Sequence, residues 1–120
     1  MRIVLLPLVF LLLTAAKHSY QPAAPVTVSC SGQDDCAAKW GRAMRWVSAR
    51  RSNYVDEVTD TRIVASPVVL ADGYNVTKIP TAANSYDIEM TVSCWSLTRC
   101  DWQAANSDFE SAVTGTSESK

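Results

Sequence analysis

The chain has 120 residues, of which 48% are hydrophobic and 19% are charged, and its formal net charge is −1 at pH 7. This length fits a single domain and excludes a large enzyme with several sites. The near-neutral charge excludes a generally basic nucleic-acid-binding protein.

The first sixteen residues have the pattern of a secretory signal peptide. Arg2 supplies a positive charge, residues 3–13 form an apolar run, and small residues at 14–16 suit a signal peptidase. The run is shorter than the roughly 20 apolar residues that a membrane-spanning helix needs. We therefore predict that residues 1–16 are removed and that the mature protein is periplasmic or secreted, without stable membrane insertion.

The two ends of the mature chain are expected to lie outside the folded domain. Residues 17–29 contain Gln21-Pro22-Ala23-Ala24-Pro25, and we identify neither a helical nor a strand period in them, which predicts a mobile N-terminal segment. Residues 115–120 form a polar tail. The predicted domain is residues 30–114.

Four cysteines are present, an even number that predicts disulfides in an oxidising compartment. Both pairs have Cys-x5-Cys spacing and no histidine nearby, so a zinc site is disfavoured. The matching spacing favours local bridges, Cys30–Cys36 and Cys94–Cys100, whereas loop-closure entropy favours a long-range pairing. We slightly prefer the local pairing and expect no metal and no cofactor.

An amphipathic helix is predicted at Asp34–Arg51. Aspartates at its start and arginines near its end complement the helix dipole. Apolar residues recur at helical spacing and form one stripe. The residues of this stripe are Cys36, Trp40, Ala43, Met44 and Val47.

Three antiparallel strands are predicted after this helix. Tyr86–Cys94 alternates apolar and polar residues, which indicates a strand with one buried and one solvated face. Val58–Val69 and Tyr74–Ile79 are rich in β-branched residues and flank the turn signal Asp72-Gly73. Within the first of these runs, Pro67 is expected to interrupt the strand.

A short C-terminal helix is predicted near Ser107–Thr114, because Ser107 and Glu110 match a capping box. The expected fold class is therefore α+β. It consists of a long amphipathic helix, a three-stranded antiparallel β-meander and a short C-terminal helix, stapled by two disulfides.

No catalytic constellation stands out, and we expect no enzyme. The one histidine, His18, lies in the segment expected to be mobile, where a general base is not held in place. Asp87 and Glu89 share one strand face and would serve a small carboxylate-dependent hydrolase. Alternating acids are, however, typical of any solvated strand face.

A candidate partner surface combines cations with two tryptophans. Five cations are the only charges between Cys36 and Arg51, and Trp46 lies among them, off the apolar stripe. Trp95 opens the segment between the last two cysteines. Both tryptophans have two interpretations: contact with a partner through stacking and charge, or packing within the fold while the cations pair with acids. The candidate surface is Lys39, Arg42, Trp46, Trp95 and Arg99.

The chain resembles a family of short exported bacterial proteins. The matching residues are Cys30-x5-Cys36 leading into a tryptophan-containing helix, Thr59-Asp60-Thr61, Val76-Thr77-Lys78 and Cys94-x5-Cys100. The resemblance covers about Cys30–Val113 and implies a periplasmic or secreted location in a Gram-negative cell. It carries over no activity.

We therefore expect an exported cell-envelope protein that acts as a non-catalytic binding or interaction module. Its partner would be a protein or an anionic envelope component, and not nucleic acid. The alternatives are a protein inhibitor or immunity factor against a toxin or hydrolase, and a small carboxylate-dependent hydrolase. Attachment to anionic lipid or glycan through the basic helix would weaken steeply with salt.

Overall fold

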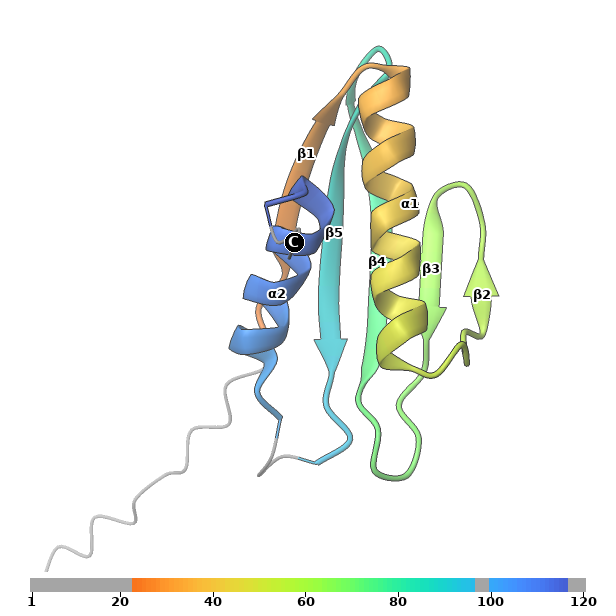
Figure 1. Cartoon of the computed structure of the whole chain (residues 1–120), viewed down its shortest axis with the longest axis vertical. Coiled ribbons are helices and arrows are strands. Elements are labelled where there is room, and N and C mark those ends of the chain that lie inside the picture. The colour runs from red at the N-terminus through yellow and green to blue at the C-terminus, as the bar shows by residue number, and fades with distance from the viewer. Residues whose placement is uncertain (1–22, 97–99, 117–120) are drawn as a thin grey trace, which may run out of the picture.

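The computed structural model describes residues 23–96 and 100–116, which form an α+β fold with two helices packed on one sheet (Figure 1). The predicted signal peptide, His18, Arg99 and residues 117–120 of the predicted tail lie outside the described residues. In chain order the elements are β1 (Val26–Ser31), α1 (Gln33–Arg50), β2 (Glu57–Val58), β3 (Arg62–Ala65), β4 (Gly73–Ala82), β5 (Ser85–Ser93) and α2 (Trp102–Thr114).

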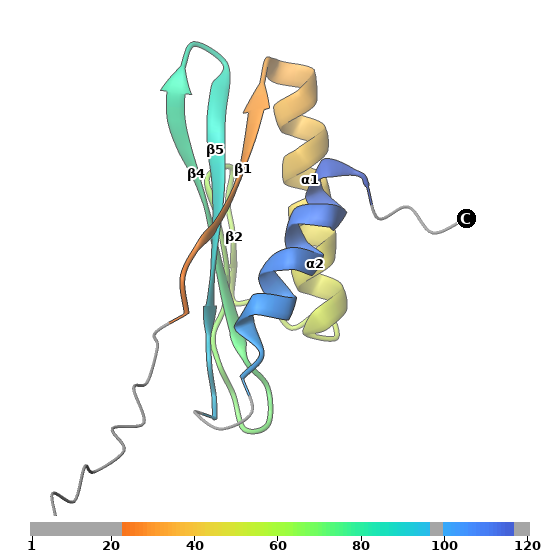
Figure 2. The same cartoon turned by 90° about the vertical axis from the view of Figure 1, so that its left-hand side faces the viewer.

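All five strands belong to one antiparallel sheet, in the order β1-β5-β4-β3-β2. β2 to β5 follow one another as a meander, and β1 pairs with the outer side of β5. Both helices cover the same face of the sheet, so no described element covers the opposite face (Figure 2). The α+β class is confirmed, but the prediction of three strands is wrong, because β1 and the two-residue β2 add an edge on each side.

β1 takes its first four residues from the segment 17–29 that we expected to lie outside the domain. Val28 and Cys30 are buried, and the residues that alternate with them, Thr27, Ser29 and Ser31, are exposed. This alternation is visible in the sequence, but it directly follows the proline-containing stretch that we interpreted as irregular. Pairing with β5 along six residues makes β1 an edge strand of the sheet.

α1 begins and ends one residue before the predicted helix. Its buried residues are Cys36, Ala43, Trp46 and Val47. Met44, which we placed in the apolar stripe, is 37% exposed. Trp46 takes its place because α2 packs along that side of α1 and widens the buried face.

α2 begins at Trp102, five residues before the predicted start. The side chain of Asp101 accepts a hydrogen bond from the backbone N–H of Ala104 at 3.0 Å and caps the first turn. Ser107 and Glu110 lie inside the helix, so the predicted capping box is wrong. The upstream aspartate instead accepts a hydrogen bond from a free backbone N–H at the start of the helix.

The core lies between the sheet and the two helices. In β5, Ile88, Met90 and Val92 are buried against the helices, while the residues between them face the open side of the sheet, as the alternation predicts. The largest fully buried side chains are Phe109, Ile63, Ile88, Met90, Val47, Val76 and Val113. Each contributes roughly 1.5–3 kcal/mol through burial.

Both disulfides connect near neighbours in the sequence. Cys30–Cys36 links β1 to α1, and Cys94–Cys100 links the end of β5 to the segment before α2. The preferred local pairing is therefore confirmed. The second bridge brings the start of α2 to the end of the sheet at which β5 finishes.

Candidate binding surface

Trp46 belongs to the core rather than to the predicted partner surface. Its residue is 8% exposed, and its ring makes edge-to-face contacts with Tyr74 and Phe109, with centroids 5.1 and 5.2 Å apart. Its indole N–H donates to a carboxylate oxygen of Asp108 at 3.0 Å. With its ring packed on two aromatic neighbours and its N–H bonded, Trp46 is not a surface contact.

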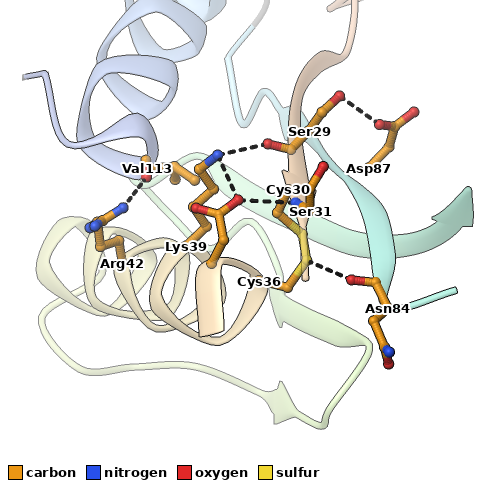
Figure 3. A network of polar contacts seen from close by, with 10 residues as sticks. Ser29, Cys30, Ser31, Cys36, Lys39, Arg42, Asn84, Asp87 and Val113 are labelled. Carbon is orange, nitrogen blue, oxygen red and sulfur yellow. Dashed lines mark hydrogen bonds and ion pairs between the residues drawn. A yellow bond between two sulfur atoms is a disulfide. The ribbon is translucent and has the colours of Figure 1, made fainter. Parts of the chain in front are cut away.

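Lys39 and Arg42 also make contacts within the fold (Figure 3). Lys39 Nζ donates to the backbone carbonyl of Ser29 at 2.9 Å and pairs with Asp35 at 3.1 Å. Arg42 Nη1 donates to the backbone carbonyl of Val113 at 2.8 Å. These two cations of α1 therefore attach the helix to β1 and to the end of α2.

The ion pair of Asp35 and Lys39 covers part of the outer edge of β1. The Ser31 amide donates to Asp35 Oδ2 at 3.0 Å, and the Ser29 carbonyl accepts from Lys39. The bond from Ser31, followed by the contact with Lys39, lowers the pKa of Asp35 below its ordinary value of 3.8. Because free edge groups invite pairing with other chains, this ion pair blunts that edge.

Arg50 is held between the two helices and the sheet. Its guanidinium lies 4.7 Å from the centre of the Trp46 ring, and its Nε donates to the Tyr74 hydroxyl at 3.0 Å. It also pairs with Asp108 at 3.3 Å. The acids that pair with α1 thus lie on the two helices, and the basic helix is largely committed to internal contacts.

The two carboxylates of the hydrolase alternative lie on the open face of the sheet. Asp87 Oδ1 accepts a hydrogen bond from the Ser29 hydroxyl at 2.8 Å. Glu89 stands between Thr27 and Thr77 in the strand register. They sit two residues apart on one strand among short polar side chains, whereas a glycosidase uses carboxylates that flank the scissile bond.

The two most exposed large apolar residues of the described chain, Leu70 and Val69, lie at one end of the molecule, in the loop where β3 leads into β4 (Figure 1). Val69 and Leu70 are 77% and 83% exposed, and Val68 is 43% exposed. Trp95, 46% exposed, is tied to the same end, because its backbone N–H donates to Asp72 Oδ1 at 2.8 Å. We call Val68, Val69, Leu70 and Trp95 the apolar tip.

The sequence reasoning missed three of these four residues. We predicted a strand over Val58–Val69 and a turn at Asp72-Gly73, but the chain reverses earlier, between the bridge partners Val68 and Ala71. Pro67, which we expected to interrupt the strand, directly precedes this turn. An apolar turn without glycine or asparagine gives no other local signal.

The turn closes on itself and strains one residue. Val68 and Ala71 exchange both backbone hydrogen bonds, each at 3.0 Å. Leu70 has a φ of 65°, a region that bulky side chains rarely adopt. Such a conformation costs on the order of 1 kcal/mol or more and persists only where the surroundings impose it.

A buried arginine and the carboxylate of Asp56 hold the base of the turn. Arg51, 6% exposed, donates from Nη1 to the carbonyls of Ser66 at 2.7 Å and Asp72 at 3.2 Å, which joins the two ends of the loop. Asp56 Oδ2 accepts the Ser66 amide at 2.6 Å. We call Arg51, Asp56 and Asp72 the clamp.

Acid is expected to weaken the clamp through Asp56. The hydrogen bonds from Ser66, and then the charge of Arg51, lower the pKa of Asp56 below its ordinary value of 3.8. A carboxylate with a lowered folded-state pKa stabilises the fold above its unfolded-state pKa, and this contribution is lost as pH falls through the folded-state value. In urea titrations, the free energy of unfolding should therefore drop below about pH 4, less steeply in Asp56→Asn than in the wild type. Asp35 leaves a residual slope, and identical slopes would show that Asp56 contributes nothing.

Comparisons with protein-family models, curated proteins and solved structures find no match to the chain. Within residues 23–96 and 100–116, no group of three or more histidine, cysteine, aspartate or glutamate side chains is placed to hold a metal ion. Over the same residues, neither helix combines the length and hydropathy of a membrane span. The apolar tip is an uncharged, constrained projection that is suited to contact with another apolar surface.

Proposed function

We propose that this protein is an exported, disulfide-bonded module of the cell envelope that binds a protein partner without catalysis, and that the apolar tip is its contact element. The signal-peptide pattern of residues 1–16 supports export. The two disulfides support it as well, because such bonds persist in oxidising compartments. The resemblance to exported bacterial proteins favours the periplasm of a Gram-negative cell.

The observation that carries this proposal is the combination of exposure and constraint at the apolar tip. Val69 and Leu70 present apolar side chains to solvent, and Arg51 of the clamp joins the two ends of the loop that carries them. Covering each side chain with a partner would contribute roughly 1.5–3 kcal/mol. Little conformational entropy would be lost, since the turn is already ordered. Local conflicts with stability of this kind concentrate at functional positions.

This contact element replaces most of the surface predicted from the sequence. Lys39, Arg42 and Trp46 make their contacts inside the fold, whereas Trp95 keeps its proposed role. Arg99 falls between the two bridged cysteines of the second disulfide, outside the described residues, and stays a predicted contact.

Replacing Leu70 with asparagine is expected to separate binding from stability. Asparagine adopts a positive φ with less strain than leucine, so the free energy of unfolding of Leu70→Asn should rise by up to about 1 kcal/mol. Binding should fall about tenfold, because the most exposed apolar side chain of the tip is lost. The first quantity is measured by urea titration, and the second by quantitative pull-down from envelope extract with the oxidised mature protein.

Ile79→Thr is the matched control for this pull-down. Ile79 is 41% exposed on β4, toward the strand end away from the tip, so the control removes an exposed apolar side chain from a different surface. Ile79→Thr should recover the same partners as the wild type. Undiminished recovery by a stably folded Leu70→Asn would show that the tip is not the contact element.

A further inference from the structure

We infer that the apolar tip inserts into a concave apolar pocket with a cationic rim on the partner protein. This inference rests on the proposed function and names the kind of partner surface that the tip fits. A wedge of this kind blocks the pocket that it enters. The inhibitor or immunity factor that we kept as an alternative is therefore the binding role that the geometry serves best.

The shape of the tip selects a pocket over a flat surface. Val69 and Leu70 are consecutive residues at the corner of a tight turn, and both are more than three-quarters exposed. A flat partner can cover only the outward side of such a corner. Burying most of both side chains, which gives the full hydrophobic contribution, needs walls around the turn.

The backbone of the turn selects recognition by side chains. The amides and carbonyls of Val68 and Ala71 are bonded to each other, so they are not available to pair with a strand of the partner. A groove that binds extended peptide through main-chain hydrogen bonds therefore does not fit this loop. A pocket that accepts aliphatic side chains does.

The negative charge of the described residues around the tip favours a partner pocket with a cationic rim. Among the described residues, the segment from Pro67 to Ala71 carries no charge, and the carboxylates of Asp56 and Asp72 lie at its base. Arg99, between the bridged cysteines, lies outside the described residues. The one cation of the clamp, Arg51, is buried. Anionic lipid headgroups would be repelled by this arrangement, since lipid surfaces attract basic segments, whereas lysine or arginine around a protein pocket would complement it.

The test uses a photoreactive residue in the full-length chain. p-Benzoylphenylalanine replaces Leu70 in one variant and Ile79 in the control, and cells that produce the protein are irradiated. Adducts are separated by mass, and the crosslinked residues are identified by mass spectrometry. In parallel, purified oxidised wild type and Leu70→Asn are floated with vesicles of phosphatidylethanolamine and phosphatidylglycerol, and with phosphatidylcholine vesicles.

The expected result is a discrete protein adduct from position 70, at least about tenfold weaker from position 79, whose crosslinked residue lines an apolar pocket of the partner. Lipid adducts, together with flotation that Leu70→Asn abolishes, would overturn the pocket inference while leaving the tip as a contact element. Equal yields from both positions, or no adduct from either, would overturn the proposed function as well.

A second substitution tests the rim. Asp72→Asn removes the negative charge but keeps an oxygen that can accept the Trp95 amide. Combined with the crosslinker at position 70, it should lower the adduct yield about fivefold at low salt and make the yield less sensitive to added salt. An unchanged yield and unchanged salt dependence would contradict a cationic rim.

Discussion

Replacing Trp46 with alanine is expected to lower the free energy of unfolding by about 3–5 kcal/mol, the range for large aromatic residues deleted from cores. The indole is 8% exposed and packs edge-to-face on Tyr74 and Phe109. The same deletion removes the hydrogen bond to Asp108 and the ring beneath Arg50. Because small domains have about 5–15 kcal/mol of stability in total, urea denaturation of Trp46→Ala should show a large shift of the midpoint.

Trp95→Ala is the matched control, since it removes the same side chain from an exposed position. Trp95 is 46% exposed, so its loss should lower the free energy of unfolding by less than about 1 kcal/mol. In the pull-down, Trp95→Ala should recover less partner than the wild type although it folds. If the free energy of unfolding of Trp46→Ala lay within about 1 kcal/mol of the wild-type value, the assignment of Trp46 to the core would be wrong.

Patterns confined to one element predicted the structure well. Helical spacing located α1 to within one residue at each end, and strict alternation located β5 and its buried residues Ile88, Met90 and Val92. The equal Cys-x5-Cys spacings indicated the local pairing. Each of these signals depends on residues that are close together in the chain, so no tertiary information was needed.

Features that depend on a neighbouring element were beyond reach. A helical wheel of α1 carries no information about where α2 packs. The contact of Phe109 with Trp46 shows that the buried face of α1 extends to the side on which Trp46 lies. Likewise, Lys39 and Arg42 donate to backbone carbonyls of β1 and α2, contacts that no charge pattern reveals. Two cations of the predicted surface, Lys39 and Arg42, therefore make their contacts within the fold.

The apolar tip was missed for a related reason. Of its exposed side chains, Val68 and Val69 belong to the β-rich run Val58–Val69 that we predicted as a strand interrupted at Pro67, and Leu70 follows it. Arg51, at least 15 residues away in the sequence, bonds the backbone at both ends of the loop that carries them. An apolar sequence that is nevertheless exposed can be recognised only once the tertiary contacts are known. This disagreement between composition and exposure is the reason for choosing the apolar tip as the candidate site.

Gly73→Ala is expected to lower the free energy of unfolding by about 3 kcal/mol, at the upper end of the range for overpacking. A Cβ at this position would lie 2.6 Å from the carbonyl oxygen of Ala65 and from both the nitrogen and the Cδ of Pro67. These are backbone or ring atoms, and Ala65 pairs with Tyr74 in the β3–β4 ladder, so they cannot move aside cheaply. Relief requires the loop base to shift, which should reduce partner recovery by the tip as well.

Gly41→Ala provides the same chemical change with the opposite expected sign. Gly41 lies within α1, and its added Cβ would approach only the flexible end of Arg45, at 3.4 Å. Alanine in place of a helical glycine stabilises by roughly 0.5–1 kcal/mol, and urea titration of both variants measures the contrast. If Gly73→Ala kept wild-type stability, the base of the loop would be plastic. The tip would then lack the preorganisation from which its insertion into a pocket was inferred, because a loop that adapts at its base has no fixed shape to match.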